Sequence, residues 1–291
     1  MKFCYVRDID KYDDNIYLSG KERFFDKIYK FFYKQRKVKG PYNIKDAAFN
    51  IVGKSIFIDT QNELCDKNMD IIYRIIDKEN IEAFCFNDDT DFKNAKEFNL
   101  PIFKGEDIRF LAYFNKLKNT VKNPQKSQIG IIIDKNTVYE HIKMICEIFP
   151  LVIFFPFDYS FGQRVSDNIL KDMGSSIYVS RNINSASKCE LVFDLSLDRL
   201  GDKLNYICCE NYMSVYKKNE YVKADKIINN VKLKPNNYVF ENMDDSYFDM
   251  SVLEGLLYSD NVIKSRKDIL NVNLDEYLDR KSFKLHFFNE S

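Results

Sequence analysis

Asp134 and Asp194 are the side chains of this 291-residue chain best placed to bind a ligand. Each follows an apolar run, Ile129–Ile133 for Asp134 and Leu191–Phe193 for Asp194. We expect these runs to be strands one and four of a parallel sheet of order 3-2-1-4, which binds ligands where the order reverses. Two facing carboxylates there would bind a cation, a sugar hydroxyl or an amine. The alternative is that they are only the polar ends of buried strands.

The first aspartate stands where a nucleotide-binding fold needs glycine. The dinucleotide fingerprint G-x-G-x-x-G follows the first strand, and in that register Asp134, Asn136 and Tyr139 occupy the three glycine positions. Side chains there obstruct a pyrophosphate, which docks on exposed backbone N–H groups. A carboxylate also repels the phosphate by about 1 to 4 kcal/mol at ~4 Å. We therefore expect no cofactor, with NAD or NADP as the alternative.

Three further side chains are candidates for ligand binding. Asp158 lies 24 residues after Asp134, near the place of a ribose-binding acid, although it could equally belong to the loop before the next helix. Arg164 and Arg181 could meet a phosphate near the ends of strands two and three, or be solvated surface arginines. The complete set of candidates is Asp134, Lys135, Asn136, Thr137, Asp158, Arg164, Arg181, Asp194 and Ser196.

The chain offers few residues for a metal site or a catalytic triad. The seven cysteines are scattered without a C-x-x-C pair, and two histidines allow no specific catalytic triad. The acidic run at 88–91 lacks the spacing of an EF-hand. We predict no metal site, and no catalytic residue can be named.

Strands alternate with capped helices after residue 127. Thr137 and Glu140 have the spacing of a capping box, as do Ser160 and Gln163. Gly174 suits the end of the second helix. On the first helix the apolar stripe leaves His141 on the polar side, so it should be exposed. The expected strands after Ile129–Ile133 are Leu151–Phe155, Ser176–Ser180, Cys189–Leu195 and Tyr206–Cys209.

This alternation predicts an α/β protein with two α/β domains, the second a Rossmann-like parallel sheet with helices on both faces. A polar stretch at 118–126 separates it from a shorter α/β run. We expect an N-terminal domain over 1–120 and a Rossmann-like domain over 127–235. Residues 236–291 should form a helix, near Asp249–Tyr258, and a strand, near Ser282–Phe288, that pack back on the body.

The order of elements resembles that of the two-domain dehydrogenases typified by shikimate dehydrogenase and glutamyl-tRNA reductase. The segment Ser185–Val192 also resembles the short helix that leads into the fourth strand of such domains. The resemblance implies an N-terminal α/β domain before a Rossmann domain, and NAD(P) as cofactor. The glycine motif of these families is missing. Where their NADP-dependent members tend to place an arginine, this chain has Pro156–Asp158.

The segment 21–39 combines eight basic residues with a phenylalanine-rich stripe, as a basic amphipathic helix would. Such a helix binds an anionic membrane, nucleic acid or a protein partner, or simply packs its apolar face on the first domain. The whole chain has 44 basic and 44 acidic residues, so it lacks a global basic field.

These observations favour a soluble, cytoplasmic protein with a degenerate nucleotide site, acting as a non-catalytic ligand-sensing or protein-interaction module. No transmembrane segment is expected, since the longest apolar run is far below ~20 residues. The first alternative is an NAD(P)-dependent oxidoreductase or nucleotide-using transferase that holds its nucleotide with Lys135, Asn136 and Ser196. The second is peripheral membrane or nucleic-acid binding through 21–39.

Overall fold

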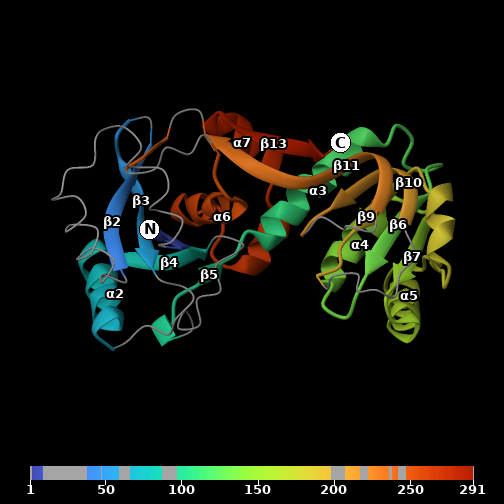
Figure 1. Cartoon of the computed structure of the whole chain (residues 1–291), viewed down its shortest axis with the longest axis horizontal. Helices are drawn as coiled ribbons and strands as arrows, with labels where there is room; N and C mark the ends of the chain where they lie inside the picture. Colours follow the sequence, from blue (N-terminus) through green and yellow to red (C-terminus); the bar gives the residue numbers. More distant parts are fainter. Residues whose placement is uncertain are drawn as a thin grey trace, which may run out of the picture. The chain divides into compact units, whose positions relative to one another are not determined.

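The computed structural model describes residues 2–8, 38–46, 48–58, 66–86, 97–197, 207–216, 222–235, 238–241 and 247–290. The predicted basic helix, apart from its last two residues, and the acidic run at 88–91 lie outside these residues. The chain divides into two units (Figure 1). Unit 1 comprises Met1–Ile108 and Lys232–Lys284, and unit 2 comprises Arg109–Val231 and Leu285–Ser291.

Unit 1 is built on a six-stranded sheet of order β12-β2-β3-β1-β4-β5. The central strands β3, β1, β4 and β5 are parallel, whereas β2 is antiparallel to β3 and β12 to β2. The sheet ends in a two-residue strand on each side, β12 and β5. The strands are β1 (Lys2–Asp8), β2 (Val38–Lys45), β3 (Ile51–Ile58), β4 (Ile81–Phe86), β5 (Ile102–Phe103) and β12 (Val239–Phe240).

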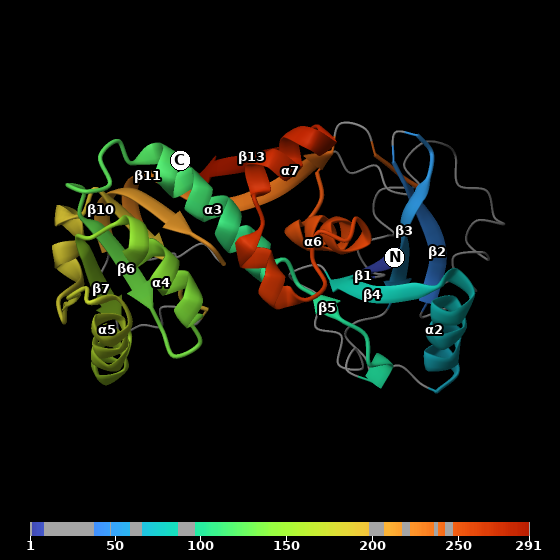
Figure 2. The ribbon, with the colours of Figure 1, turned by 180° about the vertical axis from the view of Figure 1, so that it is seen from behind.

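Helices cover both faces of this sheet because alternate side chains of each strand point to opposite sides. Cys4 and Val6 of β1 belong to a buried cluster with α2 (Asp66–Glu79). Phe3 points the other way, and its ring would lie 2.6 Å from a Cβ at Gly255 of α6 (Met250–Ser259). Only glycine therefore allows α6 this close to the sheet. Figures 1 and 2 show α2 and α6 on opposite sides. The remaining helices are the 3-10 helix η4 (Arg266–Asn271) and α7 (Leu274–Lys281).

The other sheet has seven strands in the order β13-β11-β10-β9-β6-β7-β8. From β8 to β11 every neighbouring pair is parallel. Numbered along the chain from β6, these strands run 3-2-1-4-5-6, the Rossmann order. The prediction of an α/β protein with a Rossmann-like sheet is therefore confirmed. The strands are β6 (Ile129–Ile133), β7 (Val152–Pro156), β8 (Tyr178–Val179), β9 (Leu191–Asp194), β10 (Ile207–Ser214), β11 (Val222–Pro235) and β13 (Phe283–Glu290).

In the described residues, four helices accompany this sheet: α3 (Glu106–Thr120), α4 (Tyr139–Ile148), α5 (Tyr159–Met173) and the 3-10 helix η3 (Ile183–Lys188). Ile132 of β6 packs in a cluster with Ala186 of η3. On the opposite face, Phe193 of β9 lies 6.3 Å from Phe110 of α3, ring centroid to ring centroid. The run of consecutive apolar residues in β6 and β7 thus reflects strands buried on both faces.

His141 corrects one sequence prediction. It was expected on the polar side of its helix, but it is fully buried. Its ring stacks on Phe110 with the centroids 3.8 Å apart and the planes 6° from parallel. Local periodicity does not reveal this, because the covering ring comes from α3, about thirty residues earlier in the sequence.

Both predicted capping boxes are also wrong, although the helices begin close to the expected places. The N-cap of α4 is Val138, without a side-chain cap. The N-cap of α5 is Asp158, whose carboxylate accepts from the N–H groups of Ser160 and Phe161. Gly174 does end α5, with a left-handed φ of 70°. In the described part of the chain, no helix has both the length and the apolar character needed to cross a bilayer.

Candidate functional site

Asp134 and Asp194 lie at the carboxyl ends of the neighbouring strands β6 and β9, where Ile132 pairs with Asp194. Both side chains are nearly inaccessible, with 2% and 3% of their surfaces exposed. The Asp134 carboxylate also accepts from the backbone N–H of Leu197, three residues after Asp194. The two predicted carboxylates therefore lie at one buried edge of the sheet in unit 2, the place of the ligand crevice in a Rossmann fold, and we call this edge the crevice.

The Asp134 carboxylate is bound by its own loop and by the loop after β9. Its Oδ1 accepts from the backbone N–H of Asn136, at 2.9 Å, and from the Thr137 hydroxyl, at 3.0 Å. Its Oδ2 accepts from the backbone N–H of Leu197 at 2.7 Å. The Thr137 hydroxyl in turn accepts from the Asp134 N–H, so it closes the turn instead of capping α4. One carboxylate thus ties the two loops of the crevice together.

The Asp194 carboxylate is bound equally closely. Oδ1 accepts from the N–H of Ser196, at 2.9 Å, and from its hydroxyl, at 2.6 Å. Oδ2 accepts from the hydroxyl of Tyr212 on β10 at 2.5 Å. Burial raises the pKa of Asp194, while these hydrogen bonds act in the opposite direction. Burial and the neighbouring Asp194 charge raise the pKa of Tyr212, so its phenol remains a donor at neutral pH.

The predicted site residues divide into two groups. Asp134, Thr137, Asp194 and Ser196 meet in the crevice, and the backbone of Asn136 joins them. Lys135 and the Asn136 side chain are exposed at its edge. Asp158 lies directly before α5, Arg164 lies on α5, and Arg181 follows β8. All three are exposed and do not take part in these contacts. Asp158 serves as the helix cap instead.

Tyr212 and the Leu197 N–H were not predicted. The partner of Leu197 lies 63 residues away in the sequence and that of Tyr212 lies 18 away. A hydrogen bond donated by the backbone, such as that of Leu197, cannot be predicted from the type of the residue. Tyr212 lies beyond the expected strand Tyr206–Cys209, so its position beside β9 was not predicted. A buried phenol usually finds a hydrogen-bond partner, but nothing in the sequence indicated that Tyr212 is buried.

The chemistry open to this crevice is limited by its own hydrogen bonds. Each of the four carboxylate oxygens already accepts from at least one donor. Within the described residues, three or more His, Cys, Asp or Glu side chains never gather closely enough to hold a metal ion. The arrangement stabilises two buried carboxylates and joins the β6 and β9 loops.

No protein-family model matches the chain. No curated protein matches its sequence. Among solved structures, ornithine carbamoyltransferase from Pyrococcus furiosus is similar over 89% of this chain and 82% of that one, at 10% identity and a TM-score of 0.40. A chorismate mutase/shikimate 5-dehydrogenase fusion protein from Clostridium acetobutylicum is similar over 96% and 97%, at 7% identity and a TM-score of 0.35.

L-tryptophan dehydrogenase from Nostoc punctiforme matches over 49% of this chain, at 12% identity and a TM-score of 0.29. The chain spans 44% of the length of that dehydrogenase. Such weak similarities carry no information about activity. The fold assignment rests on the strand order itself.

Proposed function

We propose that the protein is a non-catalytic ligand-sensing or protein-interaction module whose Rossmann-like crevice is closed by its own side chains. The observation that supports this most strongly is the Asp134 carboxylate, which accepts from the N–H groups of Asn136 and Leu197 at 2.9 and 2.7 Å. Backbone donors at this edge of the sheet are the groups that bind the pyrophosphate in nucleotide enzymes.

The Asp134 carboxylate therefore acts as a resident anion. A dinucleotide entering this crevice would have to displace a buried carboxylate from its three donors. It would also bring phosphate charge close to Asp134 and Asp194. Breaking each hydrogen bond to this charged group costs about 1.5–3 kcal/mol. The contacts of a dinucleotide would have to offset this cost before the dinucleotide could bind.

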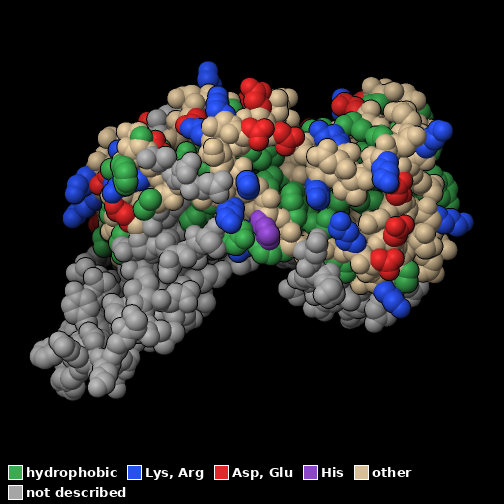
Figure 3. Space-filling view, turned by 90° about the horizontal axis from the view of Figure 1, so that it is seen from above, with side chains coloured by type: hydrophobic (Ala, Val, Ile, Leu, Met, Phe, Trp, Pro, Cys, Tyr) green, Lys and Arg blue, Asp and Glu red, His purple; other side chains and the backbone are tan. Residues whose placement is uncertain are grey.

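The alternative of an oxidoreductase or transferase with an atypical loop has less support. It would use Lys135, Asn136 and Ser196, but Ser196 is 7% exposed and directs both its N–H and its hydroxyl to Asp194. Binding of membrane or nucleic acid through 21–39 concerns residues that lie almost entirely outside the described part. On the face shown in Figure 3, basic and acidic side chains of the described residues are intermixed.

We also propose that the protein works in a reducing compartment, such as the cytoplasm. The cysteines that the structure describes are free thiols, mostly buried, and none is paired in a disulfide. Thiol titration of the denatured protein without reductant should then recover all seven cysteines of the chain.

The main test is thermal unfolding with NAD, NADP, ATP and S-adenosylmethionine. A ligand at 100 times its Kd adds about 2.7 kcal/mol of stability, or a shift of roughly 2–4 °C for a protein approaching this size. We expect no shift with either dinucleotide. A shift that disappears in the Lys135→Ala/Asn136→Ala double variant, with Lys188→Ala as an exposed control, would overturn the proposal in favour of the enzyme.

A further inference from the structure

A small pocket opens in unit 2 beside the closed crevice, at the carboxyl ends of β7 and β8. Its lining residues are Phe155, Pro156, Phe157, Ser180, Arg181 and Ile183. The cavity volume is about 30 Å³, which is room for roughly two or three water molecules. The pocket therefore encloses only part of any ligand larger than that.

Four of the six lining residues are apolar and two are polar, and both parts of the wall are firmly held. Phe155 is 3% exposed. A Cβ on Gly162 of α5 would lie 2.5 Å from the Pro156 ring, so α5 packs directly against this wall. Ser180 fixes the other side, because its hydroxyl donates to the Asn182 carbonyl oxygen at 3.0 Å and accepts from the Asn182 N–H at 3.1 Å.

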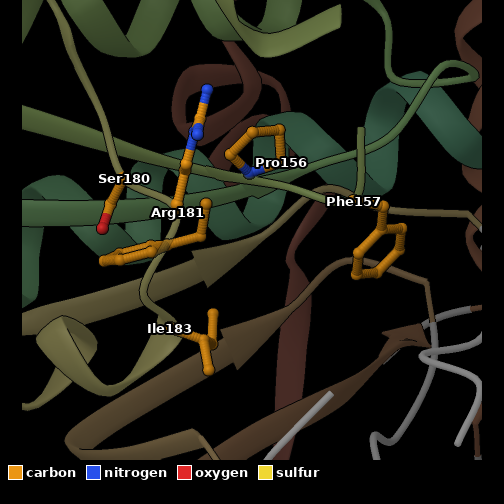
Figure 4. A pocket seen from close by; sticks show the side chains of 6 residues that line it. Pro156, Phe157, Ser180, Arg181 and Ile183 are labelled. Atoms are coloured by element: carbon orange, nitrogen blue, oxygen red, sulfur yellow. The ribbon is translucent and has the colours of Figure 1, made fainter. Parts of the chain in front are cut away.

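Arg181 is the cation of this pocket. Its guanidinium lies 4.1 Å from the centroid of the Tyr159 ring, an arrangement that holds the long side chain in one direction. Figure 4 shows Arg181 extending past Pro156 while Ile183 and Phe157 border the opposite part of the pocket. A ligand placed here would meet a positive charge at one end and apolar groups at the other.

The nearby helix terminus argues against a phosphate. The first N–H groups of α5, from Ser160 and Phe161, are already bound by the Asp158 carboxylate. That leaves Arg181 as the charged group among the lining residues, whereas phosphate sites combine several charge-assisted donors. One guanidinium beside four apolar side chains matches a single carboxylate attached to a small hydrocarbon group.

We propose that this pocket binds a small monocarboxylate with an apolar body, its carboxylate on Arg181 and its hydrocarbon part against Phe155 and Ile183. The proposal rests on the ligand-sensing role proposed above and names the chemical class of the ligand and its place. It uses none of the residues of the closed crevice.

Saturation-transfer NMR on the full chain with isobutyrate as the probe tests this assignment. Isobutyramide has the same shape without the charge, and inorganic phosphate has charge without an apolar body. We expect saturation transfer to isobutyrate with a millimolar Kd and at most weak transfer to isobutyramide. Arg181→Gln should weaken isobutyrate binding about tenfold. Arg164→Gln removes an exposed arginine of the same unit and should leave it unchanged.

Four results would overturn the assignment: no binding of isobutyrate, equal binding of isobutyrate and isobutyramide, equal effects of the two arginine variants, or competition by phosphate at lower concentration than isobutyrate. Circular dichroism of each variant separates lost binding from misfolding. Dinucleotide binding is measured independently. If the protein binds neither isobutyrate nor NAD(P), only the proposal of a monocarboxylate pocket is refuted. A protein that binds NAD(P) refutes the closed crevice.

Discussion

Replacing Glu254 by glutamine should change how the stability of the protein depends on pH. Glu254 lies on α6 with 1% of its surface exposed. Its carboxylate accepts from the N–H groups of Gly105, at 2.8 Å, and Ile108, at 3.2 Å, at the start of α3. Burial raises the pKa of Glu254 from 4.5 to about 7, although these donors and the positive charge of Arg266 act against the shift.

The sign follows from proton binding. Between pH 4.5 and about 7 the folded protein holds a proton on Glu254 that the unfolded chain has lost, so this group stabilises the fold most at low pH. That contribution is lost as the pH rises through 7. A pKa shift of this size lowers the free energy of unfolding by about 2.5 kcal/mol between pH 5 and pH 8. Glutamine cannot titrate, so Glu254→Gln should become more stable relative to the parent by about this amount across the range.

Urea unfolding followed by circular dichroism at pH 5, 6, 7 and 8 measures the difference. Comparing parent and variant at each pH cancels the titration of all other groups. Glu147→Gln, which removes an exposed carboxylate on α4, is the matched control for the loss of one negative charge. A constant difference for Glu254→Gln would mean that the backbone donors and Arg266 fully compensate for burial, and the reasoning would be refuted.

Two further substitutions examine the caps and the crevice. Asp158→Ala should lower the free energy of unfolding by about 1 kcal/mol, whereas Ser160→Ala should change it by less than about 0.5 kcal/mol. The reverse ranking in thermal unfolding would restore the capping box that the sequence suggested. Tyr212→Phe removes the donor to Oδ2 of Asp194 and should cost about 1–3 kcal/mol in urea unfolding, since a buried acceptor loses its partner. A loss within experimental error would show that water replaces the phenol.

The sheet of unit 2 was predictable because its information is local. Consecutive apolar residues in Ile129–Ile133 and Leu151–Phe155 indicate strands buried on both faces. The 3-2-1-4 order was expected because it is the usual order of a Rossmann-like sheet. The position of Asp134 and Asp194 at neighbouring strand ends follows from that order. By contrast, β1 (Lys2–Asp8) was not predicted, because its charged ends hide a buried centre.

The contacts that close the crevice were not predictable. Thr137 has the residue type and spacing of a helix cap, but its hydroxyl turns to Asp134, a competing local acceptor. Asp158 outcompetes Ser160 as the cap of α5 in the same way, since either could bind the first N–H groups. The burial of His141 depends on α3, and the hydrogen bond from Leu197 depends on a backbone group. Predicting these contacts therefore requires knowledge of the tertiary structure.

The ends of the sheets have a consequence for association between copies of the chain. The outermost strands β12 and β5 in unit 1 and β8 in unit 2 each have only two residues. The unpaired backbone of an outermost strand is the usual template for adding another chain, and a two-residue strand offers too few groups to hold one. Three of the four sheet edges in the described structure are thus protected from aggregation by their shortness, and Pro101 directly before β5 adds to this protection at one of them. The eight-residue β13 is the remaining edge, and it is where strand addition would begin.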